Sequence, residues 1–303
     1  MRQIILAINA LLKFKAYTLI NVLGLACSLA CVLTVARYIH QENTVNQCFP
    51  EYKRICLIKT STSSGENFLG GYRSGLEKDP DVEQFTVIYQ ISDMPVLFGE
   101  QEIAANTFSV DSTFFKIFPY RVIAGSGRIV RPRDVVITRS FWMKKLGGKN
   151  AIGATFKNTK GNKFTIIGVV DDPDTKTSWM PDIFMSDELD EFLFFDPIYA
   201  MLMAPDTDIA LLNKKYSKEH PRSKWSTYET VRYQYLPLKD LYYDKDHGKE
   251  NKNYQYGNQS YVRVLMVVAF LVDIIGLLNF INIYTVIMSK RSREFGVKKV
   301  FGA

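Results

Sequence analysis

Two long apolar segments, one near each end of the chain, stand out in the pattern of hydrophobic and polar positions. The run from Tyr17 to Ala36 holds twenty residues and no charge. As a helix it would cover the roughly 30 Å hydrocarbon core of a bilayer. A signal peptide would have a shorter apolar core and a small-residue cleavage site, whereas this run ends in Arg37 and Tyr38. We therefore predict a transmembrane helix over residues 16–39.

The second apolar segment runs from Val264 to Met288 and is interrupted by Asp273. A charge within a bilayer is costly and normally faces a partner or a cavity. The segment after Asp273 is too short to span a bilayer by itself, so this carboxylate lies within the membrane or at its outer edge. A buried core helix is the soluble alternative. We predict a second transmembrane helix over residues 263–288, with Asp273 as an intramembrane charge.

Two features accompany the first span. Apolar residues between positions 4 and 12 fall on one helical face, which predicts an interfacial amphipathic helix over residues 1–15. Small residues recur at four-residue spacing within the span, and Gly24 and Ser28 form one such pair. This spacing allows close approach of a neighbouring helix, although ordinary membrane composition gives the same pattern.

The intervening residues, 40–262, mix strand and helix patterns. β-branched runs and capped apolar runs predict strands at Asp134–Thr138 and Lys163–Val170 and helices at Ser140–Leu146, with Ser140 as its cap, and at Asp206–Tyr216. Stretches rich in Gly, Ser and Asn predict loops at Thr60–Gly71 and His247–Ser260. The alternation of strands and helices indicates an α+β or mixed α/β domain.

The charge distribution places the chain relative to the membrane. With 47% hydrophobic and 23% charged residues, the chain is neither disordered nor membrane-embedded throughout. Residues 1–39 hold four basic groups and no acid, and residues 263–303 hold six against two. The basic excess behind the net charge of +7 therefore lies at the two ends, +4 at each, while residues 40–262 carry −1. A nucleic-acid-binding domain would instead concentrate charge on a folded face. Basic residues beside both spans put both ends in the cytoplasm and residues 40–262 outside.

Candidate chemistry outside the membrane is sparse. His40, His220 and His247 lie far apart, and no phosphate loop or nucleophile motif occurs, so we expect no catalytic residue, no metal site and no cofactor on this chain. The acidic group of Asp171, Asp172 and Asp174 could bind a cation or form a polar turn around a proline. A second acidic cluster, at residues 187–191, is expected to be a solvated face.

Six stretches carry a family resemblance when they are taken in order: INVLGLACSLA (20–30), FFKIFPYRVIAG (114–125), VVITRSFWMKKLGGKNAIGATF (135–156), FTIIGVVDDP (164–173), YLPLKDLY (235–242) and LNFINIYTVIMSKRSREFGVKKVFGA (278–303). Each resembles the corresponding part of MacB/FtsX-type ABC transporter permeases, and together they run along nearly the whole chain. The chain resembles the N-terminal portion of an FtsX-like permease with a MacB-like periplasmic core domain. Because the family has at least four spans and this chain has two, we expect a fragment or a truncated reading frame.

The resemblance implies a bacterial inner-membrane protein with two transmembrane helices and a two-lobed periplasmic domain at 40–262, whose inserted lobe lies near 182–230. It implies a permease that transmits ATP-driven conformational change outward, for export, efflux or mechanotransmission. The implied partners are an ABC ATPase subunit that holds ATP and Mg²⁺, a second permease in a homodimer or pseudo-dimer, a periplasmic adaptor or substrate, and membrane lipid, but no nucleic acid. The permease itself is expected to be non-catalytic.

The resemblance also assigns roles to single residues. Residues 289–303 begin the cytoplasmic element that couples to the ATPase, through Arg291, Arg293, Glu294, Phe295, Gly296, Lys298, Lys299 and Gly302. Cys48 and Cys56 lie outside the membrane, where disulfides persist; two free buried thiols are the alternative. Because the family usually carries aromatic residues at both positions, we predict that these cysteines pair.

Two other classes of protein remain open. A two-span sensor with an extracytoplasmic ligand-binding domain would need heptads that continue past the second span, and Gly296 and Gly302 disfavour a continuous coiled coil. A membrane-anchored outer enzyme is disfavoured because catalytic motifs are missing.

Overall fold

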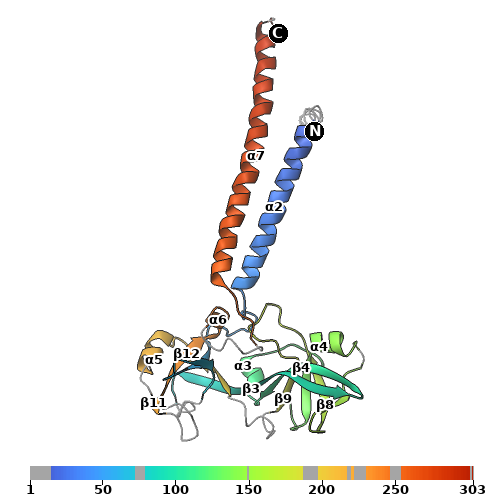
Figure 1. Cartoon of the computed structure of the whole chain (residues 1–303), viewed down its shortest axis with the longest axis vertical. Coiled ribbons are helices and arrows are strands. Elements are labelled where there is room, and N and C mark those ends of the chain that lie inside the picture. The colour runs from blue at the N-terminus through green and yellow to red at the C-terminus, as the bar shows by residue number, and fades with distance from the viewer. Residues whose placement is uncertain are drawn as a thin grey trace. The chain divides into compact units, whose positions relative to one another are not determined.

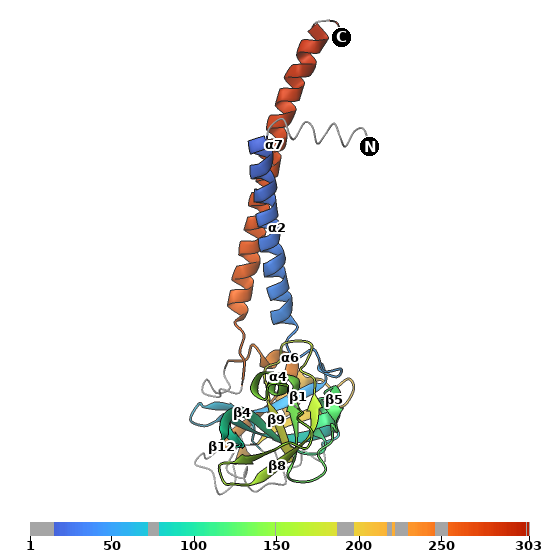
Figure 2. The same ribbon diagram turned by 90° about the vertical axis from the view of Figure 1, so that its right-hand side faces the viewer.

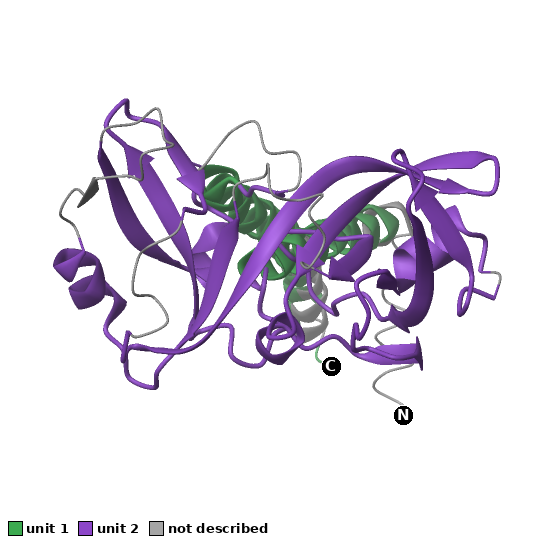
Figure 3. Cartoon of the chain, turned by 90° about the horizontal axis from the view of Figure 1, so that it is seen from below, with its two compact units in different colours: residues 1–43, 258–303 green, residues 44–257 purple. Residues whose placement is uncertain are grey.

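The structure of the protein is a computed structural model that describes residues 15–71, 79–148, 150–186, 197–216, 220–221, 230–245, 254–300 and 302. The chain divides into two compact units, residues 1–43 with 258–303 and residues 44–257 (Figure 3). The amphipathic helix predicted at 1–15 lies outside the described residues apart from Lys15.

The first unit is a pair of long helices, α2 (Lys15–Asn43) and α7 (Gln259–Val300), which run antiparallel and side by side (Figures 1 and 2). Leu19–Asn43 and Gln259–Asn282 are long and apolar enough to cross a membrane. Most of their large apolar side chains are exposed, unlike those of a core helix in a soluble protein. α7 continues unbroken past the predicted second span and through Gly296.

The second unit is a mixed α/β domain, so the predicted fold class, two apolar helices flanking such a domain, is confirmed. Its strands are β1 (Ile55–Thr62), β2 (Asn67–Leu69), β3 (Val82–Phe98), β4 (Gln101–Val110), β5 (Val122–Gly125), β6 (Asp134–Thr138), β7 (Thr155–Asn158), β8 (Lys163–Val170), β9 (Ile183–Ser186), β10 (Ile198–Met203), β11 (His220–Pro221) and β12 (Thr230–Pro237). Its helices are α3 (Phe114–Ile117), α4 (Arg139–Lys145), α5 (Ile209–Lys215) and α6 (Leu238–Leu241).

The described strands form one sheet with the order β11-β12-β1-β10-β3-β4-β9-β6-β8-β5. β4 with β9 and β6 with β8 are parallel pairs, and the other pairs are antiparallel. β7 pairs with both β8 and β3, so the sheet closes on itself through β3, β4, β9, β6, β8 and β7. We call this ring the closed lobe and the half around β12, β1, β10 and the start of β3 the open lobe.

β3 belongs to both lobes because it changes direction in its middle. Its pairing with β4 shifts between Ile91 and Met94, and Asp93 adopts a positive φ of 50°. A bulge of this kind bends a strand and increases its twist. The first half of β3 can therefore pair with β10 while the second half pairs with β7.

Three apolar cores fill the domain. The closed lobe encloses one that includes Val96, Ile137 and Phe164. The two faces of β1 contribute to the other two, because side chains alternate along a strand. Leu57 points into the central aromatic core with Trp179, and Cys56 points into a core beneath α5.

The structure changes two details of the sequence-based predictions. Thr138, not Ser140, caps α4, since its side chain accepts the Phe141 N–H. The loop predicted at Thr60–Gly71 contains the end of β1 and all of β2, which pair as a hairpin. β9 lies in the closed lobe and β10 in the open lobe, and the inserted lobe near residues 182–230 stays a prediction.

Candidate functional site

The segment that leads from α2 into the outer domain, which we call the first connection, is anchored there by Asn46, three residues after the end of α2. Its backbone N–H donates to the Lys176 carbonyl oxygen at 2.8 Å. Its side-chain amide donates to Ser178 Oγ at 2.7 Å and to the Leu238 carbonyl oxygen at 2.9 Å, and its Oδ1 accepts the Ser178 N–H at 2.7 Å. Asn46 is fully buried and has a φ of +66°, a conformation that asparagine tolerates better than most residues.

The second connection, which leads into α7, binds the same piece of chain. The Gln255 N–H donates to the Ser178 carbonyl oxygen at 2.7 Å, and Tyr254 forms an antiparallel bridge with Trp179. Residues 176–179, which we call the junction segment, therefore hold the outer-domain ends of both connections.

The junction segment is anchored in the central core. Trp179 is completely buried and meets Phe108 and Phe118 edge to face, with ring centroids 6.1 and 5.2 Å apart. Such aromatic contacts add stability beyond the buried area. A displacement of the junction segment would therefore disturb the core between the two lobes.

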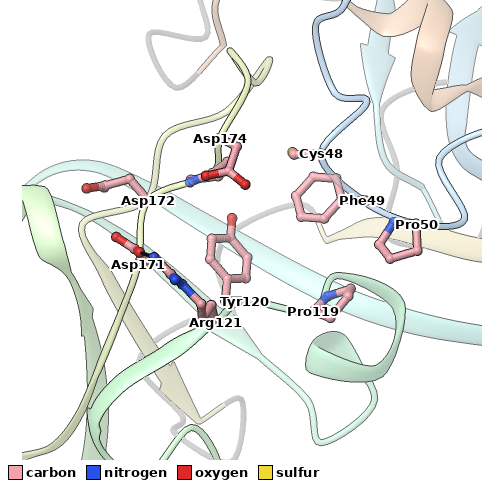
Figure 4. A pocket seen from close by; sticks show the side chains of 10 residues that line it. Cys48, Phe49, Pro50, Pro119, Tyr120, Arg121, Asp171, Asp172 and Asp174 are labelled. Atoms are coloured by element: carbon pink, nitrogen blue, oxygen red, sulfur yellow. Dashed lines mark hydrogen bonds and ion pairs between the residues drawn. The ribbon is translucent and has the colours of Figure 1, made fainter.

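A pocket of about 460 Å³ lies immediately upstream of the junction segment. Three short segments line it: Cys48–Pro50, Pro119–Arg121 and Asp171–Asp174 (Figure 4). The first belongs to the connection from α2, the second follows α3, and the third is the turn after β8. The structure thus brings the acidic group predicted as a cation site or polar turn next to Cys48.

The carboxylates of this turn differ in their partners. Asp171 pairs with Arg121 and, at 3.3 Å, with Arg139, and the hydrogen bond from Arg121 holds the pKa of Asp171 below its usual value. Asp172 accepts a hydrogen bond from Ser140 Oγ at 2.9 Å. Asp174 lines the pocket without a hydrogen bond or ion pair to any residue that the structure describes.

The disulfide predicted between Cys48 and Cys56 is wrong, because both are free thiols. Cys48 packs against the central core, whereas Cys56 points from the opposite face of β1 into the core beneath α5. Burial raises the pKa of Cys56 to about 12. Burial also raises the pKa of Cys48.

The predicted packing residues Gly24 and Ser28 lie where α2 meets α7. A Cβ on Gly24 would stand 2.8 Å from Asn279 Nδ2, and one on Gly276 would stand 2.4 Å from Ser28 Oγ. Asn279 Nδ2 donates to Asn21 Oδ1 at 3.1 Å. Small side chains therefore bring the two helices close enough for an interhelical amide pair.

Asp273 lies fourteen residues after the start of α7, on an exposed part of its surface. At about 1.5 Å per residue this places it some 20 Å along the helix. It is therefore well inside the apolar segment rather than at its outer end, and no polar partner is seen for it among the described side chains.

The predicted coupling residues belong to the last turns of α7. Gly296 lies within the helix, and Gly302 follows it with a φ of +79°. The other members belong to the helix by backbone, but their side chains lie outside the description: Arg291, Arg293, Glu294, Phe295, Lys298 and Lys299.

No local sequence pattern points to Asn46, Ser178 or Gln255. Their hydrogen bonds join residues 132 and 192 positions apart, and no local pattern encodes such a separation. A polar residue in the run VNQCF was the only available signal. Within the described residues, no group of three or more His, Cys, Asp or Glu side chains could hold a metal ion.

Known proteins resemble this chain in sequence and in fold. The family model of the MacB-like periplasmic core domain matches residues 18–215. The macrolide export ATP-binding/permease protein MacB of Pasteurella multocida (strain Pm70) is 21% identical over 334 aligned residues, which cover 99% of this chain and 47% of that protein. The chain thus spans about half the length of that relative.

Two solved structures are also similar. A domain of a candidate permease from Porphyromonas gingivalis is 19% identical, with a TM-score of 0.51, over 68% of this chain and 97% of that one. The periplasmic region of MacB from Actinobacillus actinomycetemcomitans is 14% identical, with a TM-score of 0.44, over 56% of this chain and 83% of that one. The first of these supports the fold of the outer domain.

Proposed function

The chain belongs to the family of the MacB-like periplasmic core domain, and on that premise we propose that it is a permease part of an ABC transporter. In this proposal it transmits ATP-driven conformational change across a bacterial inner membrane to residues 44–257. It serves export, efflux or mechanotransmission, and it is itself non-catalytic. ATP and Mg²⁺ bind to an ATPase partner.

The observation that carries this proposal is the shared attachment of both connections to the junction segment. Asn46 from the α2 side and Gln255 from the α7 side bond to opposite ends of Ser178, one to its N–H and one to its carbonyl oxygen. A change in the position of either helix would therefore act on the same buried residue, Ser178. Allosteric transmission needs such an element, whose position two distant sites can both bias.

The length of α7 supports a link to a cytoplasmic partner. Its 42 residues correspond to about 63 Å of helix, roughly twice the hydrocarbon thickness. With both ends of the chain inside, as the loop charges predict, the last turns of α7 extend beyond the lipid. We propose that residues 289–303 contact the ATPase there, through Arg291, Arg293, Glu294, Phe295, Gly296, Lys298, Lys299 and Gly302.

Co-purification tests this assignment in the permease expressed with its ATPase. Glu294→Ala, Phe295→Ala and Gly296→Leu should each reduce recovery of the ATPase while the permease stays in the membrane. A basic lipid anchor is the alternative, worth about 1 kcal/mol per charge. It would tolerate Glu294→Ala and Phe295→Ala but weaken with Lys298→Gln and Lys299→Gln. Unchanged ATPase recovery in the first three variants would remove the coupling role.

The two-span sensor remains a second candidate because α7 continues unbroken through Gly296. The sequence pattern suggests that Gly296 disfavours an extended signalling helix, but a glycine within α7 does not exclude one. A sensor would retain no ATPase during purification, so the same experiment separates the two functions. A homodimer or pseudo-dimer and a periplasmic adaptor or substrate complete the proposed transporter.

A further inference from the structure

The pocket upstream of the junction segment has a lining that energy transmission does not require. It combines three carboxyl groups and one guanidinium with an apolar wall made by Phe49, Pro50 and Pro119 (Figure 4). Its volume of about 460 Å³ falls within the range of small-molecule sites, which are concave and mainly apolar with a few placed polar groups. Because carboxyl groups outnumber the guanidinium group in this lining, an anionic ligand is disfavoured.

One carboxylate remains for a ligand. Asp171 is neutralised by Arg121 and Arg139, and Asp172 accepts a hydrogen bond from Ser140. Asp174 makes no such contact with the residues that the structure describes, yet it lines the pocket. A carboxylate beside an apolar wall is stabilised most by a cationic ligand group, because charge-assisted hydrogen bonds are the strongest that it can form.

A second, independent observation is the hydroxyl group of Tyr120. Its Oη is fully buried and has no hydrogen-bond partner among the described residues. Figure 4 shows this oxygen directed to the region between Asp174 and Cys48. Burial of an unsatisfied hydroxyl is unfavourable, so a wall of the pocket presents a polar atom for which the described residues supply no partner.

We propose that this pocket is a binding site for a small organic ammonium ion with an apolar body. The ammonium group donates to Asp174 and to Tyr120 Oη, and the faces of Phe49 and Tyr120 favour a nearby cation. The apolar body packs against Pro50 and Pro119. This inference concerns the outer domain alone and does not depend on the proposed coupling to an ATPase.

The test uses the full chain in lipid nanodiscs and phenethylamine as the probe. Isothermal titration calorimetry should detect binding of phenethylamine. It should detect no binding of phenylacetate, which has the same ring and a negative charge. Asp174→Asn should weaken binding at least tenfold. Glu100→Gln is the matched control, because it removes one carboxylate from an exposed turn that does not line the pocket and should leave the affinity unchanged.

Tyr120→Phe separates binding from folding. Because the hydroxyl bonds to no residue in the described part of the chain, its removal should leave the thermal unfolding midpoint unchanged or slightly raised while phenethylamine binds more weakly. Three results would overturn the proposal: no binding of phenethylamine to the wild-type chain, equal binding of phenylacetate, or equal affinities for Asp174→Asn and Glu100→Gln. An unchanged affinity in Tyr120→Phe would equally contradict the geometry.

Discussion

Asn46 and Ser178 form a reciprocal pair, in which the Asn46 amide donates to the Ser178 hydroxyl and accepts the Ser178 backbone N–H, both at 2.7 Å. The two residues lie 132 positions apart. One follows the first membrane helix, and the other lies between strands of the closed lobe. The pair is buried, so water cannot replace either bond at low cost.

Asn46→Ala should therefore destabilise the outer domain. It leaves the Ser178 N–H and the Leu238 carbonyl oxygen without their partner, and each unsatisfied buried group costs about 1–3 kcal/mol. The change also places alanine at positive φ. Chemical denaturation monitored by tryptophan fluorescence measures the loss of stability.

Asp206→Ala is the matched control for Asn46→Ala, since Asp206 has nearly the same φ, +64°, but is exposed. It carries the backbone strain without the buried hydrogen bonds. Equal destabilisation by the two substitutions would show that the amide contacts contribute nothing.

The contact between α2 and α7 predicts a specific crosslink. With Cys27 and Cys31 replaced by alanine, Asn21→Cys combined with Asn279→Cys should form a disulfide under mild oxidation in membranes, because the native side chains are 3.1 Å apart. Thr34→Cys with Asn279→Cys should not, since Thr34 lies more than three turns further along α2. A shift in molecular mass after cleavage between the helices reports the bond. Equal crosslinking of both pairs would contradict this helix register.

The buried thiol of Cys56 predicts a dependence of stability on pH. Its pKa rises from 9.0 to about 12 on folding, so the folded state retains a proton that the unfolded state releases. The stabilisation is complete below pH 9 and is lost as the pH rises toward 12. The difference in unfolding free energy between the wild type and Cys56→Ala should therefore shrink over this range. A constant difference would show that burial does not keep the Cys56 thiol protonated.

Asp273→Leu should leave membrane insertion intact or improve it. An ionised carboxylate near the centre of a transmembrane helix costs about 2.5–3.5 kcal/mol on insertion scales, and the described part of the helix pair offers it no partner. Alkaline extraction of membranes measures the inserted fraction. Asn21→Leu is the control, since it removes a polar group that does have a partner. If only Asp273→Leu prevents insertion, the carboxylate is required rather than tolerated.

Local patterns predicted the elements that depend on nearby residues. The strands at Asp134–Thr138 and Lys163–Val170 lie where β-branched runs placed them. The α4 cap was misplaced because Thr138 and Ser140 are chemically equivalent candidates two residues apart. Gly296 disfavours a coiled coil in the sequence pattern but does not interrupt α7, because a single glycine costs a helix only about 1 kcal/mol.

Long-range features could not be predicted in this way. Cys56 lies on β1 and Cys48 in the connection before it, and the two enter different cores. Their short distance in sequence does not reveal this long-range packing. The division into lobes depends on a bulge near Asp93 that lets β3 serve both. The lining of the pocket and the contacts of the junction segment each join pieces of chain more than 100 residues apart.

The central claim is that ATP binding at a partner changes the outer domain through the junction segment. Double electron–electron resonance between spin labels at Lys160→Cys in the closed lobe and Leu211→Cys in the open lobe tests it most directly, with the four native cysteines replaced and the permease assembled with its ATPase. The account predicts that trapping ATP shifts the distance distribution, and that Glu294→Ala abolishes the shift. Superimposable distributions with and without trapped ATP would contradict it.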